Sequence, residues 1–180
     1  GGGTADWATK RHEAKWYNSG GNSFSSNGVK VIRFDLTCSG SEMLDPLSCV
    51  VSFKIKNDSY DGTVNKNLHM VTDAHALFRR IIVKCGGVTV SDIDYTNRLA
   101  HMLMEFVPTQ KRSNLAIMTG QAGTVVENEM TLAIPIISPL FLQDKMLPLS
   151  FMSLQVSFEL VDSPLDILLR DTDLPAGVTA

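Results

Sequence analysis

The chain has 180 residues, of which 44% are hydrophobic and 19% are charged, and its formal net charge is −3. This length provides for one sizeable hydrophobic core but not for two ordinary domains, and the low charge predicts that the chain also buries surface against neighbouring subunits. The acidic balance excludes a domain that coats nucleic acid over its whole surface, because neutralising phosphates requires concentrated Lys and Arg.

No apolar run reaches the roughly 18 residues of a membrane-spanning helix, and no signal peptide opens the chain. The sequence does not begin with Met, so we expect it to start inside a longer or processed polypeptide. Its three cysteines are odd in number and match no CxxC pair, which predicts reduced thiols in an intracellular protein. These cysteines are Cys38, Cys49 and Cys85.

Residues 1–28 differ from the rest of the chain because they are rich in Gly, Ser and Asn. We interpret them as an N-terminal arm that becomes ordered by contact with a partner or another subunit. Aromatic and basic residues in this arm permit a weak contact with nucleic acid, although so few cations favour packing on protein. The candidate interface residues of the arm are Trp7, Trp16 and Tyr17.

Strand patterns begin after the arm. In 29–36 and again in 48–56, apolar residues alternate with polar ones, which is typical of strands that bury one face. The polar segment 57–62 is a loop by composition. Farther on, Gly86-Gly87 separates 81–85 from 88–90 and predicts a β-hairpin, since two glycines supply the positive φ angles of a primed two-residue turn.

One helix is expected next, capped by Asp92 or Asp94 and ended by Pro108. Four apolar residues are spaced three or four positions apart, so they lie on one face of this helix. We expect this face to pack in the core or against another subunit. These residues are Leu99, Met102, Leu103 and Phe106; with Tyr95 at the start of the helix, Leu99, Met102 and Phe106 are candidate interface residues.

The polar segment 109–130 is expected to be a long loop. Strand patterns return at 131–138, 146–152 and 153–160, with prolines that indicate edges, bulges or turns. The sequence therefore predicts an all-β fold, an antiparallel eight-stranded jelly-roll sandwich with one helix between strands. Its expected organisation is an arm at 1–28, a jelly-roll domain at 29–170 and a linker or tail at 171–180.

No motif for catalysis or cofactor binding is present, since the sequence contains no GxSxG, HExxH, P-loop or GxGxxG pattern. His69 and His75 flank Asp73, but this spacing matches none of the usual metal-ligand patterns. Glu127 and Glu129 lie in a polar segment and are expected to be solvated. We therefore expect no catalytic, cofactor-binding or metal site and no enzymatic activity.

Two segments, 76–99 and 136–166, resemble the first jelly roll of double-jelly-roll major capsid proteins of icosahedral DNA viruses. In the first segment, Leu77-Phe78 opens the hairpin that precedes the helix containing Tyr95. In the second, Leu140-Phe141 and Asp144-Lys145 lead to Leu147-Pro148 and an amphipathic strand. The resemblance covers about a third of the chain, and its motifs are short and degenerate.

The resemblance implies a structural protein that self-assembles into an icosahedral shell through trimeric capsomers. It also implies other capsid proteins as partners, a location in the virion after assembly inside the host cell, no cofactor and no enzymatic activity. Because a double jelly roll needs about twice this length, the chain is expected to be the first half of such a protein.

Three alternatives remain open. The chain is compatible with a single-jelly-roll capsid protein, as in many small RNA viruses. An attachment or carbohydrate-binding β-sandwich would need an exposed aromatic cluster on a strand face, whereas the tryptophans lie in the arm. A cupin-type enzyme would need His and carboxylate ligands clustered on strands, which the sequence does not predict.

Overall fold

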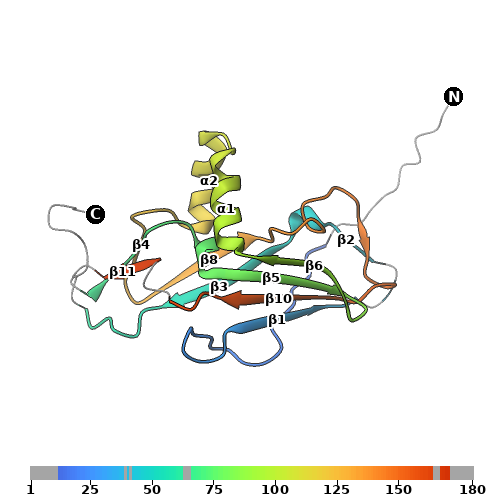
Figure 1. The fold of residues 1–180 in the computed structure, drawn as a ribbon, viewed down its shortest axis with the longest axis horizontal. Helices are drawn as coiled ribbons and strands as arrows, with labels where there is room; N and C mark the ends of the chain where they lie inside the picture. Colours follow the sequence, from blue (N-terminus) through green and yellow to red (C-terminus); the bar gives the residue numbers. More distant parts are fainter. Residues whose placement is uncertain (1–11, 39, 41, 63–65, 164–166, 171–180) are drawn as a thin grey trace.

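The computed structural model of the protein describes residues 12–38, 40, 42–62, 66–163 and 167–170. Within these ranges the chain forms short antiparallel strands and two α-helices. The longer strands follow the long axis of the molecule, and the helices rise together from one side of them (Figure 1). The mostly β, antiparallel class is confirmed; the expectation of a single helix is wrong, and the count of eight jelly-roll strands stays a prediction.

The largest sheet contains four strands in the order β1-β10-β5-β6. β10 lies in its centre because it pairs with β1 on one side and with β5 on the other, so Val156 is opposite both Phe34 and Val83. Segments far apart in the sequence thereby become neighbours. The four strands are β1 (Val31–Leu36), β5 (Phe78–Cys85), β6 (Val88–Asp94) and β10 (Leu154–Leu160).

The second layer is the antiparallel pair of β3 (Val50–Lys56) and β8 (Glu129–Pro135). Its register places Phe53 opposite Leu132, so the apolar side chains of both strands share the inner face. The Phe53 ring meets the Phe78 ring of β5 edge-on, with 5.2 Å between the centroids. Aromatic packing therefore joins the two layers.

The core is built from the residues that alternate inward along these strands. Phe158 is fully buried, and its ring contacts Phe34 at 6.0 Å and Phe78 at 5.4 Å. Val83 and Ile134 are also completely buried. The predicted alternation in 29–36, 48–56 and 153–160 is confirmed, since the inward-facing residues of these segments all belong to the core or pack against it.

The predicted hairpin is also confirmed. Gly86 and Gly87 have φ angles of +55° and +85° and connect β5 to β6. Cys85 pairs directly with Val88, so the two glycines form the whole turn. A residue with a Cβ atom would be strained at either position, which explains why glycine occupies both.

Two smaller sheets flank the sandwich, one with three strands and one with two. The strand expected at 146–152 is shorter than predicted: only its second and third residues pair, and the amide of Phe151 then donates to the carbonyl of Pro148 in a turn. Pro148 lacks the N–H that a longer ladder would need. The strands are β4 (Leu68–Met70), β7 (Val125–Val126) and β11 (Leu168–Arg170), and β2 (Met43–Leu44) with β9 (Leu147–Pro148).

The expected loop at 109–130 is wrong in its first half, which forms the second helix. α1 (Thr96–Glu105) ends before Pro108 as predicted, and α2 (Thr109–Thr119) then begins directly after this proline. Good helix formers make up about half of α2, but its apolar residues do not gather on one face, so the periodicity gave no signal. Pro108 and Gly120 bracket the segment and are the signal that could have revealed it.

Replacing Gly120 with alanine should destabilise the fold. Gly120 ends α2 with a φ of +71°, and a Cβ atom there would lie 2.9 Å from Sδ of the buried Met70. Gly123→Ala is a matched control, because Gly123 also has a positive φ (+85°) but nothing within 4 Å of its Cβ position. In urea denaturation, backbone strain should lower the free energy of unfolding of both variants by about 1–2 kcal/mol. The loss should be larger for Gly120→Ala because of the contact with Met70. Equal losses in the two variants would show that the Met70 side chain moves aside freely.

Candidate assembly site

The hairpin of α1 and α2 holds most of the predicted interface residues, and Tyr95 begins it. Tyr95 adopts a left-handed conformation (φ 55°, ψ 39°) as the N-cap residue of α1. The expected cap by Asp92 or Asp94 is wrong, because both residues belong to β6 and no side chain caps the helix. The Asp94 carboxylate instead accepts from the Tyr95 amide at 3.0 Å, which helps to hold this unusual backbone conformation.

Two guanidinium groups lie over the Tyr95 ring. The Cζ atom of Arg98 is 5.0 Å from the ring centroid, and that of Arg79 is 5.7 Å away. Arg79 also lies 3.5 Å from the Asp94 carboxylate and 3.2 Å from that of Asp162. These contacts fix the position at which α1 leaves the sheet, and they leave the Tyr95 side chain half exposed.

α1 is amphipathic, but its large apolar side chains face outward. Thr96 and Ala100 are buried and lie one turn apart, and the helix packs on the short 3-10 helix η3 (Ala74–Leu77). Leu99 is half buried, whereas Met102, Leu103 and Phe106 are 60%, 40% and 82% exposed. Small residues thus anchor the helix to the core. We name Met102, Leu103 and Phe106 the hairpin surface.

The arm residues do not join this hairpin. Trp16 is half buried, packs against the core, and donates from its indole nitrogen to the Thr37 carbonyl at 2.9 Å. Tyr17 beside it is 82% exposed. The next residues run along β1, where the Ser19 amide donates to the Arg33 carbonyl at 2.8 Å. Trp7 lies outside the described residues, as does the predicted tail at 171–180.

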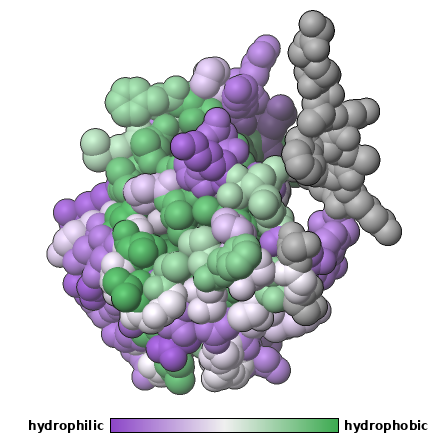
Figure 2. Space-filling view, turned by 90° about the vertical axis from the view of Figure 1, so that its right-hand side faces the viewer, coloured by the Kyte–Doolittle hydropathy of each residue, from purple (hydrophilic) through white to green (hydrophobic). Residues whose placement is uncertain are grey.

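A second group of exposed apolar residues was not predicted from the sequence. β2 and β9 pair at one end of the sandwich and carry Met43 and the neighbouring Met146, which are 66% and 52% exposed. Leu47 follows in the short helix η1 (Pro46–Ser48), and Phe151, in the turn after β9, is 91% exposed. Figure 2 shows this end of the molecule, where apolar surface gathers in the middle of the face. We name Met43, Leu47, Met146 and Phe151 the end surface; no periodicity revealed it, because these residues lie in two-residue strands and turns.

His75 and Asp73 form a buried polar pair beneath α1. The His75 ring is 1% exposed; its Nδ1 lies 3.2 Å from the Asp73 carboxylate and its Nε2 lies 3.3 Å from the Pro135 carbonyl. Burial opposes ionisation of the Asp73 carboxyl group and by itself would raise its pKa. The pKa of Asp73 is nevertheless below its usual value, because the carboxylate accepts hydrogen bonds from the ring and the amide of His75 and lies near the His75 and His101 charges. The contacts of His75 are those of a satisfied core residue that links η3 to β8.

Replacing Asp73 with asparagine should change how stability depends on pH. A carboxyl group whose pKa is lowered by folding stabilises the folded state at pH values above its ordinary pKa, which is about 4. This contribution to stability is lost as the pH falls through the lowered pKa. Wild type should therefore exceed Asp73→Asn in stability at pH 7, and the gap should narrow below about pH 4. Urea denaturation at several pH values measures this difference in the free energy of unfolding. The control is Asp92→Asn, which removes an exposed ion-pair partner of Arg80. Its difference in stability from wild type should be smaller.

Among the described residues, no group of three or more His, Cys, Asp or Glu side chains could hold a metal ion. All three cysteines are free thiols. Burial, together with the nearby Asp45, raises the pKa of the Cys49 thiol to about 11, so this group stays protonated at neutral pH. In the part of the chain that the structure describes, no helix has the length and hydropathy needed to cross a membrane.

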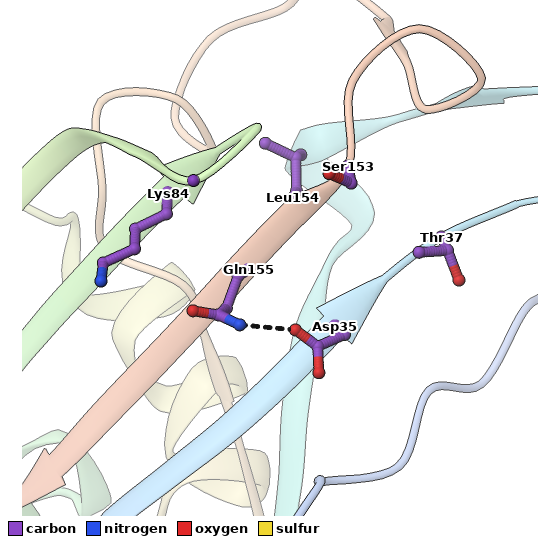
Figure 3. Close-up of a pocket in the computed structure, with 7 residues that line it drawn as sticks. Asp35, Thr37, Lys84, Ser153, Leu154 and Gln155 are labelled. Atoms are coloured by element: carbon purple, nitrogen blue, oxygen red, sulfur yellow. Dashed lines mark hydrogen bonds between the residues drawn. The ribbon is translucent and has the colours of Figure 1, made fainter.

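A shallow depression lies where β1, β10 and the β5–β6 turn come together (Figure 3). Two of its polar side chains bind each other, since the Gln155 amide donates to the Asp35 carboxylate at 2.8 Å. The hydroxyl of the nearby Ser19 donates to the other carboxylate oxygen at 3.2 Å. The Lys84 side chain lies on the neighbouring strand. This arrangement links three parts of the chain and pairs no nucleophile with a base.

No protein-family model and no curated protein sequence matches the chain. Solved structures do share its fold. VP54 of PBCV-1, from a crystal structure fitted into a reconstruction of the virophage Sputnik, is 15% identical with a TM-score of 0.58. A chain of the quasi-atomic model of the PBCV-1 virus capsid is 16% identical with a TM-score of 0.59. In both cases the match covers 89% of this chain and 38% of the other chain.

The fold therefore defines the class of protein: a mostly β chain with the fold of viral capsid proteins. The resemblance to major capsid proteins found in two sequence segments is confirmed at the level of the fold, because the superposition extends over nearly the whole chain. The chain spans only 38% of the length of these capsid proteins.

Proposed function

We propose that this protein is a structural subunit of an icosahedral virus shell. The observation that carries the proposal is the fold shared with PBCV-1 capsid chains over 89% of the sequence. Large apolar side chains exposed on the hairpin surface and the end surface support it, since a chain that functions alone is expected to bury such residues. The protein would reside in the virion after assembly inside the host cell.

More specifically, we propose that the chain is the first jelly roll of a double-jelly-roll major capsid protein. The matched capsid chains are more than twice as long as the matched region, as expected if the chain corresponds to one of two similar halves. The order of the Leu77-Phe78 and Leu140-Phe141 motifs favours the first half. The domain boundaries proposed from sequence, 1–28, 29–170 and 171–180, belong to this proposal.

The proposed partners are further copies of the chain, in trimeric capsomers, and other capsid proteins. Tyr95, Leu99, Met102 and Phe106 are proposed to pack between subunits through the α1–α2 hairpin. Trp7, Trp16 and Tyr17 are proposed as contacts of the arm, with a weak additional contact to nucleic acid. We propose no catalytic role; in the depression near Asp35, the Asp35 carboxylate is held by Gln155 and Ser19.

Electron microscopy of the purified native protein, combined with light scattering after gel filtration, tests the proposal. Trimers or regular shells are the expected result. Closed shells formed by the 180-residue chain alone would favour a single-jelly-roll capsid protein instead. A discrete monomer at all concentrations would contradict a capsid role.

A further inference from the structure

The depression near Asp35 contains a row of polar side chains from three neighbouring strands. Asp35 of β1 pairs across the sheet with Gln155 of β10, and Gln155 pairs with Lys84 of β5. Side chains paired in this way share one face of a sheet, with about 5 Å between their Cβ atoms. The row lies on the outer face, because Leu154 and Val156 alternate with Gln155 and are buried. Figure 3 shows Gln155 in the middle, with its amide nitrogen toward Asp35 and its amide oxygen on the side of Lys84.

Much of the hydrogen-bonding capacity of this row is unused. A carboxylate can accept about four hydrogen bonds, and Asp35 accepts one on each oxygen, from Gln155 and from Ser19. Within the described part of the chain, no group donates to the Gln155 amide oxygen, and the Lys84 ammonium has no hydrogen-bond or ion-pair partner. The row therefore offers acceptors on Asp35 and Gln155 beside the donors of Lys84.

The shape of the depression limits the size of a ligand. It is also lined by Thr37 and Ser153, which carry hydroxyl groups, and by Gly87 of the β5–β6 turn. The Gly86 amide donates to the Ser153 carbonyl at 3.1 Å, which holds this turn against the residue that precedes β10. The cavity volume of about 270 Å³ lies just below the range of about 300–1,000 Å³ that is typical of small-molecule sites. The depression thus suits a small ligand.

We propose that this depression binds one sugar unit of a neutral carbohydrate. The two ionic groups of the row have opposite signs, so Asp35 would repel a small anion and Lys84 would repel a small cation. An apolar ligand would leave the polar groups of the row without partners. The hydroxyl groups of a sugar both donate and accept, so they can donate to Asp35 and Gln155 and accept from Lys84. This binding function goes beyond the proposed capsid function and does not depend on it.

The affinity of a single site is expected to be low. Among the described residues no aromatic side chain lines the depression, so a sugar would be held by hydrogen bonds without a stacking contact. We expect a dissociation constant on the order of 1 mM, since each hydrogen bond replaces one to water. In an assembled shell, the repetition of the site would raise the avidity for a surface that carries many glycans.

Saturation-transfer difference NMR on the purified protein tests the proposal. The probes are the methyl glycosides of glucose, galactose and mannose, with glucuronate as the anionic comparison. At least one neutral glycoside should receive saturation from the protein. Lys84→Ala and Gln155→Ala should each weaken its binding about 10-fold, because each variant removes one hydrogen-bonding group from the row.

Arg33→Ala is the matched control, because Arg33 is an exposed cation on the same face of β1 and does not line the depression. This variant should bind the glycoside as wild type does, and circular dichroism verifies that all variants fold. The proposal is overturned by the absence of saturation in every neutral glycoside, or by binding that both Lys84→Ala and Gln155→Ala retain. Preferred binding of glucuronate that is lost in Lys84→Ala would indicate an anion site instead. None of these results depends on assembly, so the capsid proposal is tested separately by electron microscopy and light scattering.

Discussion

Phe158→Ala is expected to lower the free energy of unfolding by about 3–5 kcal/mol, the range for removing a buried phenylalanine. Phe158 is completely buried in the central strand β10, and its ring contacts Phe34 and Phe78. The cavity would open on the inner face of the sheet, next to the Phe34 and Phe78 rings, and the backbone pairing of β10 on both sides limits its collapse. Urea denaturation followed by tryptophan fluorescence measures the loss.

Phe151→Ala is the matched control for this substitution. The same side chain is removed, but Phe151 is 91% exposed, so the stability of the monomer should change by no more than about 0.5 kcal/mol. A loss at position 158 as small as the loss at position 151 would mean that the aromatic cluster around Phe158 does not form the core.

Met102→Glu is expected to abolish assembly while the subunit stays folded. Met102 is 60% exposed on α1, so a charge there remains hydrated in the free subunit, and the free energy of unfolding should change by no more than about 0.5 kcal/mol. In an assembled particle the same carboxylate would be buried at the proposed contact without a partner. Gel filtration with light scattering measures assembly, and circular dichroism verifies the fold.

Gln110→Glu serves as the control for Met102→Glu, because it adds the same charge to an exposed position of the same hairpin outside the hairpin surface. This variant should assemble nearly as wild type does. If both variants assemble normally, the α1 face is not an intersubunit contact. If Met102→Glu unfolds, then α1 contributes to the core more than its exposure indicates.

The amino-acid sequence by itself determined the long strands and the turn that joins two of them. Alternation of apolar and polar residues reports which side of a strand is buried, and this property depends on neighbouring residues alone. It located the buried residues of β1, β3 and β10. Gly86-Gly87 was equally informative, because a two-residue turn with positive φ angles admits few residue types.

The tertiary structure alone decided the short strands, α2 and the orientation of α1. β4, β7 and β11 contain two or three residues each, too few for a periodic pattern, and they exist because distant segments pair. α1 was predicted from its apolar stripe, yet the side chains of α1 that are buried are Thr96 and Ala100, and the helix packs on η3. An apolar stripe shows that a helix face avoids water, but it does not show whether the chain's own core or another subunit will cover that face.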